Sequence, residues 1–384
     1  MEVKELSNKL LGNLSDVKTG TRNNQDKNAD GIYPFYVRSD NVERINTFSY
    51  DSEAIMIPGE GNIGKIVHYV NGPHEVHQRV YRISNFSDEI YPKYLYWYLK
   101  QFFGHHAELN TVKATVDSLR LPTFLNFRVN YPDFSEQQAI AEALSDTDEL
   151  IRTLKQEIEK KEILLRALSQ RLIPWNFLTS LPTGWSLVTL GETGTITGAG
   201  VDKVFRNDEK EVTLINYMDV YRNDGLSKSL NYVKTSATAK QISNCSLRKA
   251  DVLFTPTSET PEDIARSSVI IDDIPNAVYS YHLIRFRPSQ AFDLNFLKHI
   301  FNIDDFRSQV RKSAEGSGTR YVITLPRFRS LVIPIPDLPT QSHIGSTLDE
   351  TSSEIKKLKI ELSKYECLKQ GMMNDLLTGK VRLV

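Results

Sequence analysis

Apolar residues recur every seven positions over a stretch of the chain, 135–172, that contains neither proline nor glycine. A repeat of this period places the apolar side chains along one seam of an α-helix, with the Glu, Lys and Gln residues on its other faces. At 1.5 Å per residue the helix would be roughly 55 Å long, and its seam needs a partner helix. Ser135 and Gln138 are expected to form a capping box at its start. The seam residues are Leu144, Ile151, Ile158, Leu165 and Leu172.

The partner lies in the same chain, because the C-terminal part repeats this stretch 204 positions later. Pro132 matches Pro336 and Gln137 matches Gln341, and the match also reaches upstream, where Leu-Pro stands at both 121–122 and 325–326. A register held over this length predicts a tandem duplication that ends in a second long helix. The matching seam residues are Leu348, Ile355, Leu362 and Leu376.

Each long helix follows a globular segment, and the two segments repeat one order of short β-rich runs, an aromatic or apolar helix and a polar loop. Proline and glycine punctuate the runs, as is typical of a mostly β core. We therefore expect an α/β (α+β) protein with two domains that diverge in their loops, which favours two binding sites of one kind for different targets. The expected boundaries are 1–134, 135–173, 174–338, 339–378 and a tail, 379–384.

Composition limits the possible partners. The formal net charge of −1 and pI near 6.7 give no overall attraction to nucleic acid, so a DNA-binding surface would have to gather its basic groups locally. The sequence contains no apolar run of membrane-spanning length and no signal-peptide core, which predicts no membrane partner. Two cysteines, Cys245 and Cys367, form no disulfide framework and indicate a reducing, cytoplasmic location.

The order of these elements resembles the specificity (S) subunit of a Type I restriction–modification enzyme over the whole chain. The resemblance rests on NYPDFSEQQAIAEAL and PIPDLPTQSHIGSTL before the two helices, on LPTGWSLVTLGE at the start of the second domain, and on the tail MMNDLLTGKVRLV. One departure is Pro339-Thr340-Gln341, where the family commonly has Glu before Gln, as Glu136-Gln137 does.

The resemblance implies two target-recognition domains and two spacer helices that pack antiparallel as a coiled coil. Each domain would read one half of a bipartite, asymmetric target in double-stranded DNA, and the helices would set the spacing, about one helical turn or roughly 34 Å. It further implies that the helices dock two modification (methyltransferase) subunits and that restriction/translocase subunits join the complex. S-adenosylmethionine, ATP and magnesium would then be bound by these partners, and this chain would be a non-catalytic subunit without a cofactor.

Local patterns that suggest catalysis are weak. The segment 59–65 matches GxxxxGK, but Ile66 stands where a magnesium-binding hydroxyl is needed, so we expect a turn. Five histidines at 68, 74, 77, 105 and 106 lack supporting ligands at a metal-binding spacing, so no metal site is predicted. Two alternatives stay open: the specificity subunit of a related Type II enzyme that fuses methylase and nuclease, and a coiled-coil adaptor that binds proteins instead of DNA.

Candidate DNA-contacting residues are basic or polar side chains in the loops, where Arg can read guanine and Lys, Ser and Thr can contact phosphates. The densest basic stretch lies at 307–329 and includes Arg307 and Arg329, while YLYWYL is expected in the core. The first-domain candidates are Lys18, Thr19, Arg22, Asn23, Arg38, Lys65, Lys113, Thr115 and Arg120. The second-domain candidates are Lys203, Arg206, Arg311, Lys312, Ser317, Thr319, Arg320 and Arg327.

Overall fold

A computed structural model describes residues 5–111, 117–175, 181–318 and 320–383 of the chain. By its internal contacts the chain divides into two compact units. Unit 1 comprises Met1–Lys155 with Ile360–Val384, and unit 2 comprises Gln156–Lys359. Both long helices therefore contribute one part to each unit. None of the helices in the described residues is apolar over a length that could span a membrane.

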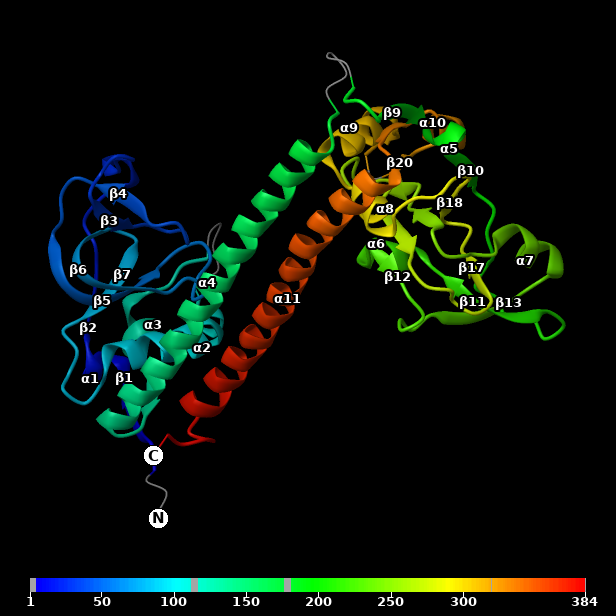
Figure 1. Cartoon of the computed structure of the whole chain (residues 1–384). Coiled ribbons are helices and arrows are strands. Elements are labelled where there is room, and N and C mark those ends of the chain that lie inside the picture. Colours follow the sequence, from blue (N-terminus) through cyan, green and yellow to red (C-terminus); the bar gives the residue numbers. More distant parts are fainter. Residues whose placement is uncertain (1–4, 112–116, 176–180, 319, 384) are drawn as a thin grey trace. The chain divides into compact units, whose positions relative to one another are not determined.

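Unit 1 is built on a six-stranded sheet (Figure 1). Its neighbouring strands are antiparallel, apart from β3 and β6, which run parallel. A separate antiparallel pair, β1 (Ser7–Leu10) with β8 (Arg128–Tyr131), joins the start of the domain to the segment before the long helix. The sheet order is β2 (Asp16–Thr19), β7 (Val80–Ser84), β5 (Tyr50–Pro58), β6 (His68–Val76), β3 (Tyr33–Tyr36) and β4 (Glu43–Ile45).

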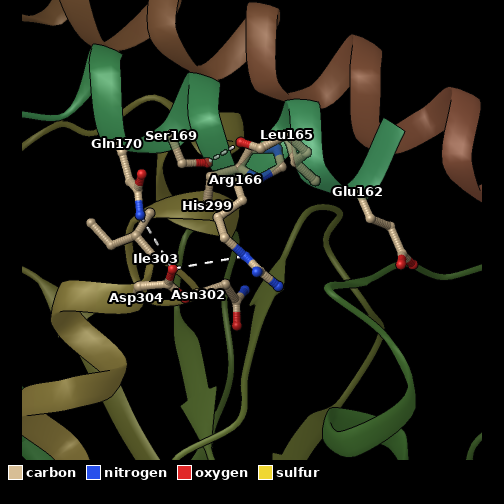
Figure 2. Close-up of a pocket in the computed structure, with 9 residues that line it drawn as sticks. All are labelled: Glu162, Leu165, Arg166, Ser169, Gln170, His299, Asn302, Ile303 and Asp304. Carbon is tan, nitrogen blue, oxygen red and sulfur yellow. Dashed lines mark hydrogen bonds and ion pairs between the residues drawn. The ribbon is translucent and has the colours of Figure 1, made fainter. Parts of the chain in front are cut away.

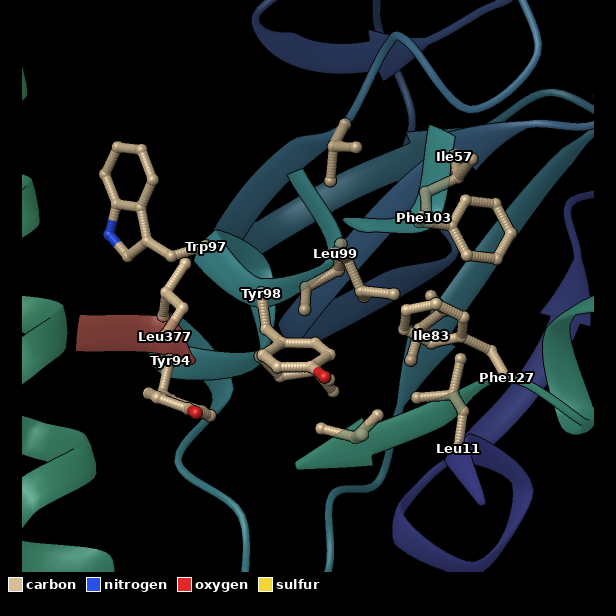
Figure 3. Close-up of a cluster of buried hydrophobic side chains, with 14 of the residues drawn as sticks. Leu11, Ile57, Ile83, Tyr94, Trp97, Tyr98, Leu99, Phe103, Phe127 and Leu377 are labelled. Atoms are coloured by element: carbon tan, nitrogen blue, oxygen red, sulfur yellow. The ribbon is translucent and has the colours of Figure 1, made fainter. Parts of the chain in front are cut away.

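Helix α2 (Pro92–Leu109) supplies the aromatic part of the unit 1 core. Figure 3 shows its side chains packed among Leu11, Ile57 and Ile83, which come from helix α1 (Leu11–Leu14) and the sheet. Because aromatic rings carry the largest apolar areas of any side chain, this helix contributes much of the burial that holds the unit together. The predicted core assignment of YLYWYL is correct for its buried members, Tyr94, Leu95, Trp97, Tyr98 and Leu99.

Unit 2 repeats the strand order of unit 1, which confirms the tandem duplication. Strands β10, β18, β14 and β16 correspond to β2, β7, β5 and β6, and β11 pairs in parallel with β17 as β3 does with β6. The long strand β6 of unit 1 corresponds to two shorter strands of unit 2, β16 and β17. The strands are β10 (Gly194–Thr197), β18 (Ile284–Pro288), β14 (Val252–Phe254), β16 (Ser267–Ile270), β12 (Gly225–Leu226), β13 (Val233–Ala237), β11 (Lys210–Ile215) and β17 (Ala277–Tyr279).

Smaller strands complete unit 2, and both units contain short helices. A three-stranded sheet has the order β15, β20, β19, and β21 pairs with β9 as β8 does with β1. Their bounds are β15 (Thr257–Ser258), β20 (Arg320–Val322), β19 (Glu315–Ser317), β21 (Val332–Ile335) and β9 (Ser186–Thr189). The short helices are η1 (Asn24–Asp26) and α3 (Leu121–Leu125) in unit 1, and α5 (Leu190–Thr193), α6 (Tyr217–Arg222), α7 (Ala239–Cys245) and α10 (Leu325–Arg329) in unit 2.

The counterpart of α2 in unit 2 is broken. The sequence predicts one helix over this stretch, but the structure has α8 (Leu294–Ile300) and α9 (Asp304–Ser313). The Asn302 side chain donates a hydrogen bond to the Lys298 carbonyl (2.8 Å) at the end of α8. Ile303 is extended, and two aspartates then open α9, where the helix dipole favours negative charge. A stop signal followed by a start signal thus divides the helix.

The long helices are α4 (Phe134–Leu172) and α11 (Leu338–Leu377), and they run antiparallel within each unit (Figure 1). In unit 1 the ion-pair partners on α11 fall in residue number as those on α4 rise, from Asp148–Lys369 to Lys155–Glu366. These pairs are largely exposed and contribute little stability, so the apolar seam is the main source of packing. The pairs are Asp148–Lys369 and Lys155–Glu366 in unit 1, and Lys161–Glu354 and Glu162–Lys359 in unit 2.

The seam residues lie between the helices and the domains. Six are buried, and Leu165, Leu172 and Leu362 are half-buried. The mixed outcome follows the helix geometry, because a straight helix drifts away from a strict seven-residue repeat along its length. The buried six are Leu144, Ile151, Ile158, Leu348, Ile355 and Leu376.

The predicted capping box at Ser135 is wrong. The helix begins at Phe134, and the Asp133 carboxylate accepts hydrogen bonds from the Glu136 N–H (3.0 Å) and the Ser135 hydroxyl (2.8 Å). Asp337 takes the same role in α11, where it accepts the Thr340 N–H at 2.9 Å. An aspartate before the first turn satisfies an N–H that has no partner within the helix, which moves the cap from Ser135 to Asp133.

The departure at Thr340 has a structural counterpart. Its equivalent in the first copy, Glu136, is buried and accepts hydrogen bonds from the Arg382 guanidinium, at 2.6 and 2.8 Å, and from the Leu383 N–H at 3.0 Å. This bidentate pair ties the C-terminal tail to the start of α4 within unit 1. Thr340 cannot form such a pair, so this contact distinguishes the start of α4 from that of α11.

Candidate nucleic-acid interface

Unit 1 has a hollow of about 320 Å³ at one end of its sheet. It lies where β5 ends and the turn before β7 begins, and an isolated bridge between Glu60 and Ser118 closes one side. Polar and charged side chains predominate, which is the composition expected of a surface that contacts DNA. The lining residues are Thr19, Gly59, Glu60, Gln78, Arg79, Tyr81, Ser118, Leu119 and Arg120.

Two arginines share one carboxylate at this hollow. The Arg38 guanidinium donates to Glu60 at 3.1 Å, and the Arg79 guanidinium donates to the other oxygen of the same carboxylate. The side chains of Arg38 and Arg79 are 48% and 53% exposed, whereas that of Glu60 is 20% exposed. The group therefore presents two cationic heads outward over a more buried acid, with a net charge of +1.

The backbone of Arg79 is fixed on both sides. Its carbonyl accepts the Gly59 N–H at 2.9 Å, and its own N–H donates to His77 Nδ1 at 3.0 Å. A Cβ on Gly59 would come within 2.8 Å of the Tyr81 ring, so a glycine is required there. Burial lowers the pKa of His77, and the charges of Arg38 and Arg79 lower it further. A neutral imidazole can accept the hydrogen bond at Nδ1.

An equivalent hollow, of about 440 Å³, lies in unit 2. The strand pairing fixes the correspondence of positions: Thr257 pairs with Val322 as Glu60 bridges Ser118, and the Leu283 N–H bonds to Ser280 as the Val80 N–H does to His77. Arg79 therefore corresponds to His282 and Glu60 to Thr257. The hydrogen bonds from the His77 N–H to Tyr36 and from the Ser280 N–H to Ile215 align Arg38 with Tyr217 in the same way. The lining residues are Tyr217, Met218, Tyr221, Thr257, Ser258, Glu259, Asp263, His282 and Arg320.

The second hollow has a different chemistry. The Tyr217 hydroxyl donates to the Thr257 carbonyl at 2.9 Å, in place of the arginine–carboxylate contact of unit 1. The rings of Tyr217 and Tyr221 stack with centroids 6.0 Å apart, and the Arg266 guanidinium lies over the Tyr221 ring at 5.9 Å. Of two equivalent surfaces, one is thus lined by arginines around a single carboxylate, and the other by two tyrosines, two carboxylates and one arginine, Arg320.

The predicted first-domain residues divide into three groups. Thr19 and Arg120 line the hollow, and Arg38 borders it through Glu60, while Lys18 and Lys65 are exposed outside the lining. Arg22 and Asn23 make internal contacts instead: Arg22 pairs with the buried Glu75 (3.3 Å), and Asn23 accepts from Gln78. Lys113 and Thr115 lie outside the described residues.

The predicted second-domain residues are more scattered. Arg320 lines the hollow, whereas Lys203, Arg311, Lys312 and Ser317 are exposed elsewhere on the unit. Arg206 donates both its terminal nitrogens to Asp202, and Arg327 pairs with Glu315 at 2.5 Å. Thr319 lies outside the described residues.

Arg307 is wrongly placed by the sequence among the exposed basic residues. It is buried and donates to the carbonyls of Ala265 (2.9 Å) and Glu262 (2.5 Å), and burial lowers its pKa to about 10. Arg329 is exposed but donates to the Ile196 carbonyl at 3.2 Å. The basic density of this stretch is therefore partly structural.

Several residues of the hollows were missed. Arg79 and Gln78 stand in a run that reads as strand, and no local pattern marks them as loop residues at a turn. Tyr217 and Tyr221 belong to α6, a helix that the first copy does not form after Arg38, the counterpart of Tyr217. An alignment of the turn before β7 with the turn before β18 could have identified Gln78 and Arg79 as turn residues.

Another hollow of unit 2, about 390 Å³, lies between the end of α4 and the α8–α9 corner (Figure 2). Asp304 is the polar centre there, with Arg166 Nε at 3.8 Å and the Gln170 amide at 3.4 Å. His299 takes the position of Trp97 in unit 1, since each lies six residues after the N–H that bonds to Gln341 or Gln137, and the larger indole is buried there. This hollow therefore reflects a smaller side chain at one junction of helix and domain.

The structure does not support the two sequence patterns that suggest a nucleotide-binding loop and a metal site. Residues 63–65 form a turn, as expected, and the chain then enters β6 without the helix that a phosphate-binding loop requires. Over the described parts of the chain, no three His, Cys, Asp or Glu side chains gather in an arrangement that could hold a metal ion.

Comparison with known proteins gives one consistent result. The family model for the Type I restriction modification DNA specificity domain matches residues 4–160 and 182–363. The chain is 26% identical over 175 residues to the Type I restriction enzyme EcoDI specificity subunit of Escherichia coli, covering 46% of this chain and 38% of that protein. It is 23% identical over 271 residues to the MjaVIII specificity subunit of Methanocaldococcus jannaschii, covering 68% and 63%.

The chain thus aligns with less than two thirds of the length of either relative. Among solved structures, the S subunit of a Type I restriction–modification system from M. genitalium matches with a TM-score of 0.69 at 16% identity. That match covers 98% of this chain and 96% of the other, so the two share a fold from end to end.

Proposed function

Since the chain belongs to the family of Type I restriction–modification DNA specificity domains, we propose that it is the sequence-recognition subunit of such a complex. Each globular domain reads one half of a bipartite target in double-stranded DNA. The long helices set the spacing between the halves. The proposal concerns the whole chain, because the family model matches both copies of the duplication.

The single observation that carries this proposal is the pair of equivalent hollows with different linings. A duplicated scaffold keeps the place of contact, while substitution of its lining changes what is contacted. Arg38 and Arg79 in one copy give way to Tyr217 and His282 in the other. Two halves of one asymmetric target require this combination of shared geometry and different chemistry.

Local charge supports DNA as the target despite the neutral chain. The hollow of unit 1 brings Arg38, Arg79 and Arg120 around the one carboxylate of Glu60, which leaves a net charge of +2. Basic groups gathered at one place supply the electrostatic part of DNA binding without a high overall charge. Arg is also the side chain that reads guanine most often.

We further infer that this chain performs no chemistry itself. Two modification subunits would dock on the helices α4 and α11, bind S-adenosylmethionine and methylate adenine. A restriction subunit would use ATP and magnesium for translocation and cleavage. The free thiols of Cys245 and Cys367 fit the reducing cytoplasm in which such a complex works.

Selection from a pool of random duplexes tests the proposal. The complex of this chain with its modification subunit is incubated with the pool at several salt concentrations, and the retained duplexes are sequenced. We expect a motif of two short conserved blocks separated by a spacer of fixed length, and retention that falls steeply as salt rises. Retention that is independent of both sequence and salt would overturn the proposal and favour a protein-binding adaptor.

A further inference from the structure

We propose that Glu60 positions Arg38 and Arg79 as a two-arginine reader of guanine in the half-site contacted by unit 1. The inference rests on the proposed function and adds to it a base preference, a positioning residue and an asymmetry between the halves. Glu60 is an unusual residue for this place, because a carboxylate stands within a surface that is expected to meet phosphates.

The geometry leaves both arginines with unused donors. A guanidinium has five N–H groups in a fixed fork, and in the described structure the Arg38 and Arg79 side chains each use one nitrogen on Glu60. Guanine offers O6 and N7 in the major groove, which one such fork can bridge with two hydrogen bonds. The contact with Glu60 restrains each side chain while its other N–H groups remain available.

The surroundings restrain the same two residues at their backbones. The hydrogen bonds of Gly59 and His77 hold the main chain of Arg79 on both sides. One residue beyond Arg38, the Ser39 carbonyl accepts from the ring of His68 at 3.1 Å. Because the side chains are ordered before DNA arrives, less conformational entropy is lost on binding.

The second copy lacks this group entirely. Tyr217, Thr257 and His282 stand at the positions of Arg38, Glu60 and Arg79, so these three positions hold no arginine pair. Arg320 and Arg266 lie at other positions around this hollow, where Arg266 pairs with Asp263. The inference therefore predicts guanine as a determinant of one half-site, through this group, and not of the other at the equivalent place.

The role of Glu60 can be separated from simple charge because the two predict opposite effects. A carboxylate that merely faces the phosphates repels them, so its removal would strengthen binding to every sequence equally. A carboxylate that positions arginines contributes to discrimination, so its removal would weaken binding to the target relative to other duplexes. The decisive quantity is the ratio of the two affinities.

The experiment measures that ratio for Glu60→Gln in the complex with the modification subunit. The probes are the selected target duplex, the same duplex with its unit 1 guanine replaced by adenine, and an unrelated duplex. We expect discrimination against the adenine duplex to fall about ten- to a hundredfold, while affinity for the unrelated duplex holds or rises. Undiminished discrimination would overturn the inference.

Two further variants are measured with the same duplexes, one as a control for charge and one to remove a guanidinium fork. Glu259→Gln removes the same charge from the hollow of unit 2, where no arginine pair depends on it, and should leave discrimination at the unit 1 guanine unchanged. Arg79→Lys keeps the charge but removes the fork, so it should reduce discrimination as Glu60→Gln does. Equal effects of Glu60→Gln and Glu259→Gln would contradict the inference. Failure of the unaltered complex to select any duplex would instead contradict the proposed function.

Discussion

Gln137 and Gln341 make the same hydrogen bonds at the starts of the two long helices. Each side-chain amide donates to the carbonyl of the proline five residues earlier, Pro132 at 3.0 Å and Pro336 at 2.9 Å. Each amide oxygen accepts a backbone N–H just before the domain helix, from Tyr91 at 2.7 Å and Asp293 at 3.1 Å. Both glutamines are buried, so each fixes a spacer helix to its own domain.

Replacing either glutamine with alanine should destabilise the chain by about 1–3 kcal/mol, because buried donors and acceptors lose their partners. The two effects should be similar, and slightly larger for Gln137, which also donates to the Glu89 carbonyl at 2.9 Å. Urea unfolding of each variant measures the loss. Gln170→Ala, at an exposed site with one long hydrogen bond, is the control and should cost much less. A cost at only one of the two buried sites would contradict their equivalence.

Trp97 and His299 allow a reciprocal test of the junction between helix and domain. Trp97 is buried, donates to the Ser145 hydroxyl at 3.2 Å and packs under the Lys369 ammonium at 4.8 Å. Trp97→His should create a cavity and cost about 3 kcal/mol. His299→Trp should cost less, because the hollow beside His299 offers room for the larger ring. Thermal unfolding of the two variants compares the costs, and the reverse order would contradict this account.

Acid should destabilise unit 1 through its buried histidines. Burial lowers the pKa values of His68, His74 and His77 below the ordinary 6.5. The unfolded chain therefore binds protons that the folded unit does not, and stability falls as the pH drops through 6.5 toward the lowered values.

Trp97 fluorescence in a Trp175→Phe, Trp185→Phe background reports on unit 1, and its urea midpoint should be lower at pH 5.5 than at pH 7.5. His74→Gln should reduce that difference, while His105→Gln, at an exposed site, should leave it unchanged. A midpoint that does not depend on pH in this range would contradict the assignment of neutral, buried histidines.

The length of the spacer helices should determine the distance between the two half-sites. Inserting four residues into α4 between Glu149 and Glu162, together with four at the facing part of α11, lengthens each helix by about 6 Å. The paired insertion keeps the antiparallel ion pairs in register and should increase the preferred half-site spacing by about two base pairs of 3.4 Å. The selected motif measures the change, and insertion in α4 alone is the control that breaks the register. If the paired insertion left the preferred spacing unchanged, the length of the helices would not set the distance between the half-sites.

The sequence predicts the parts of this fold that depend on local periodicity and on repetition. The seven-residue pattern around Leu144 predicts the long helix, and the match of Gln137 with Gln341 predicts the duplication, because both can be read along the chain. The capping residue was missed because serine and aspartate are both good caps, and their competition is decided by the geometry of the first turn.

The candidate site was predicted less well because it depends on contacts across the sheet. Arg38, Glu60 and Arg79 are far apart in the sequence, and only the parallel pairing of β3 with β6 and the turn before β7 bring them together. Arg307 shows the opposite error, since basic density along the chain cannot distinguish a buried arginine that binds carbonyls from an exposed one.

Methylome sequencing of a host that expresses this chain with its modification subunit tests the central claim most directly. We expect methylated adenine in one new motif that is split into two different half-sites by a fixed spacer. We also expect that exchanging the loops of one domain changes one half-site alone. Assembly of the complex without any new methylated motif, or a motif with a single undivided recognition block, would contradict the account.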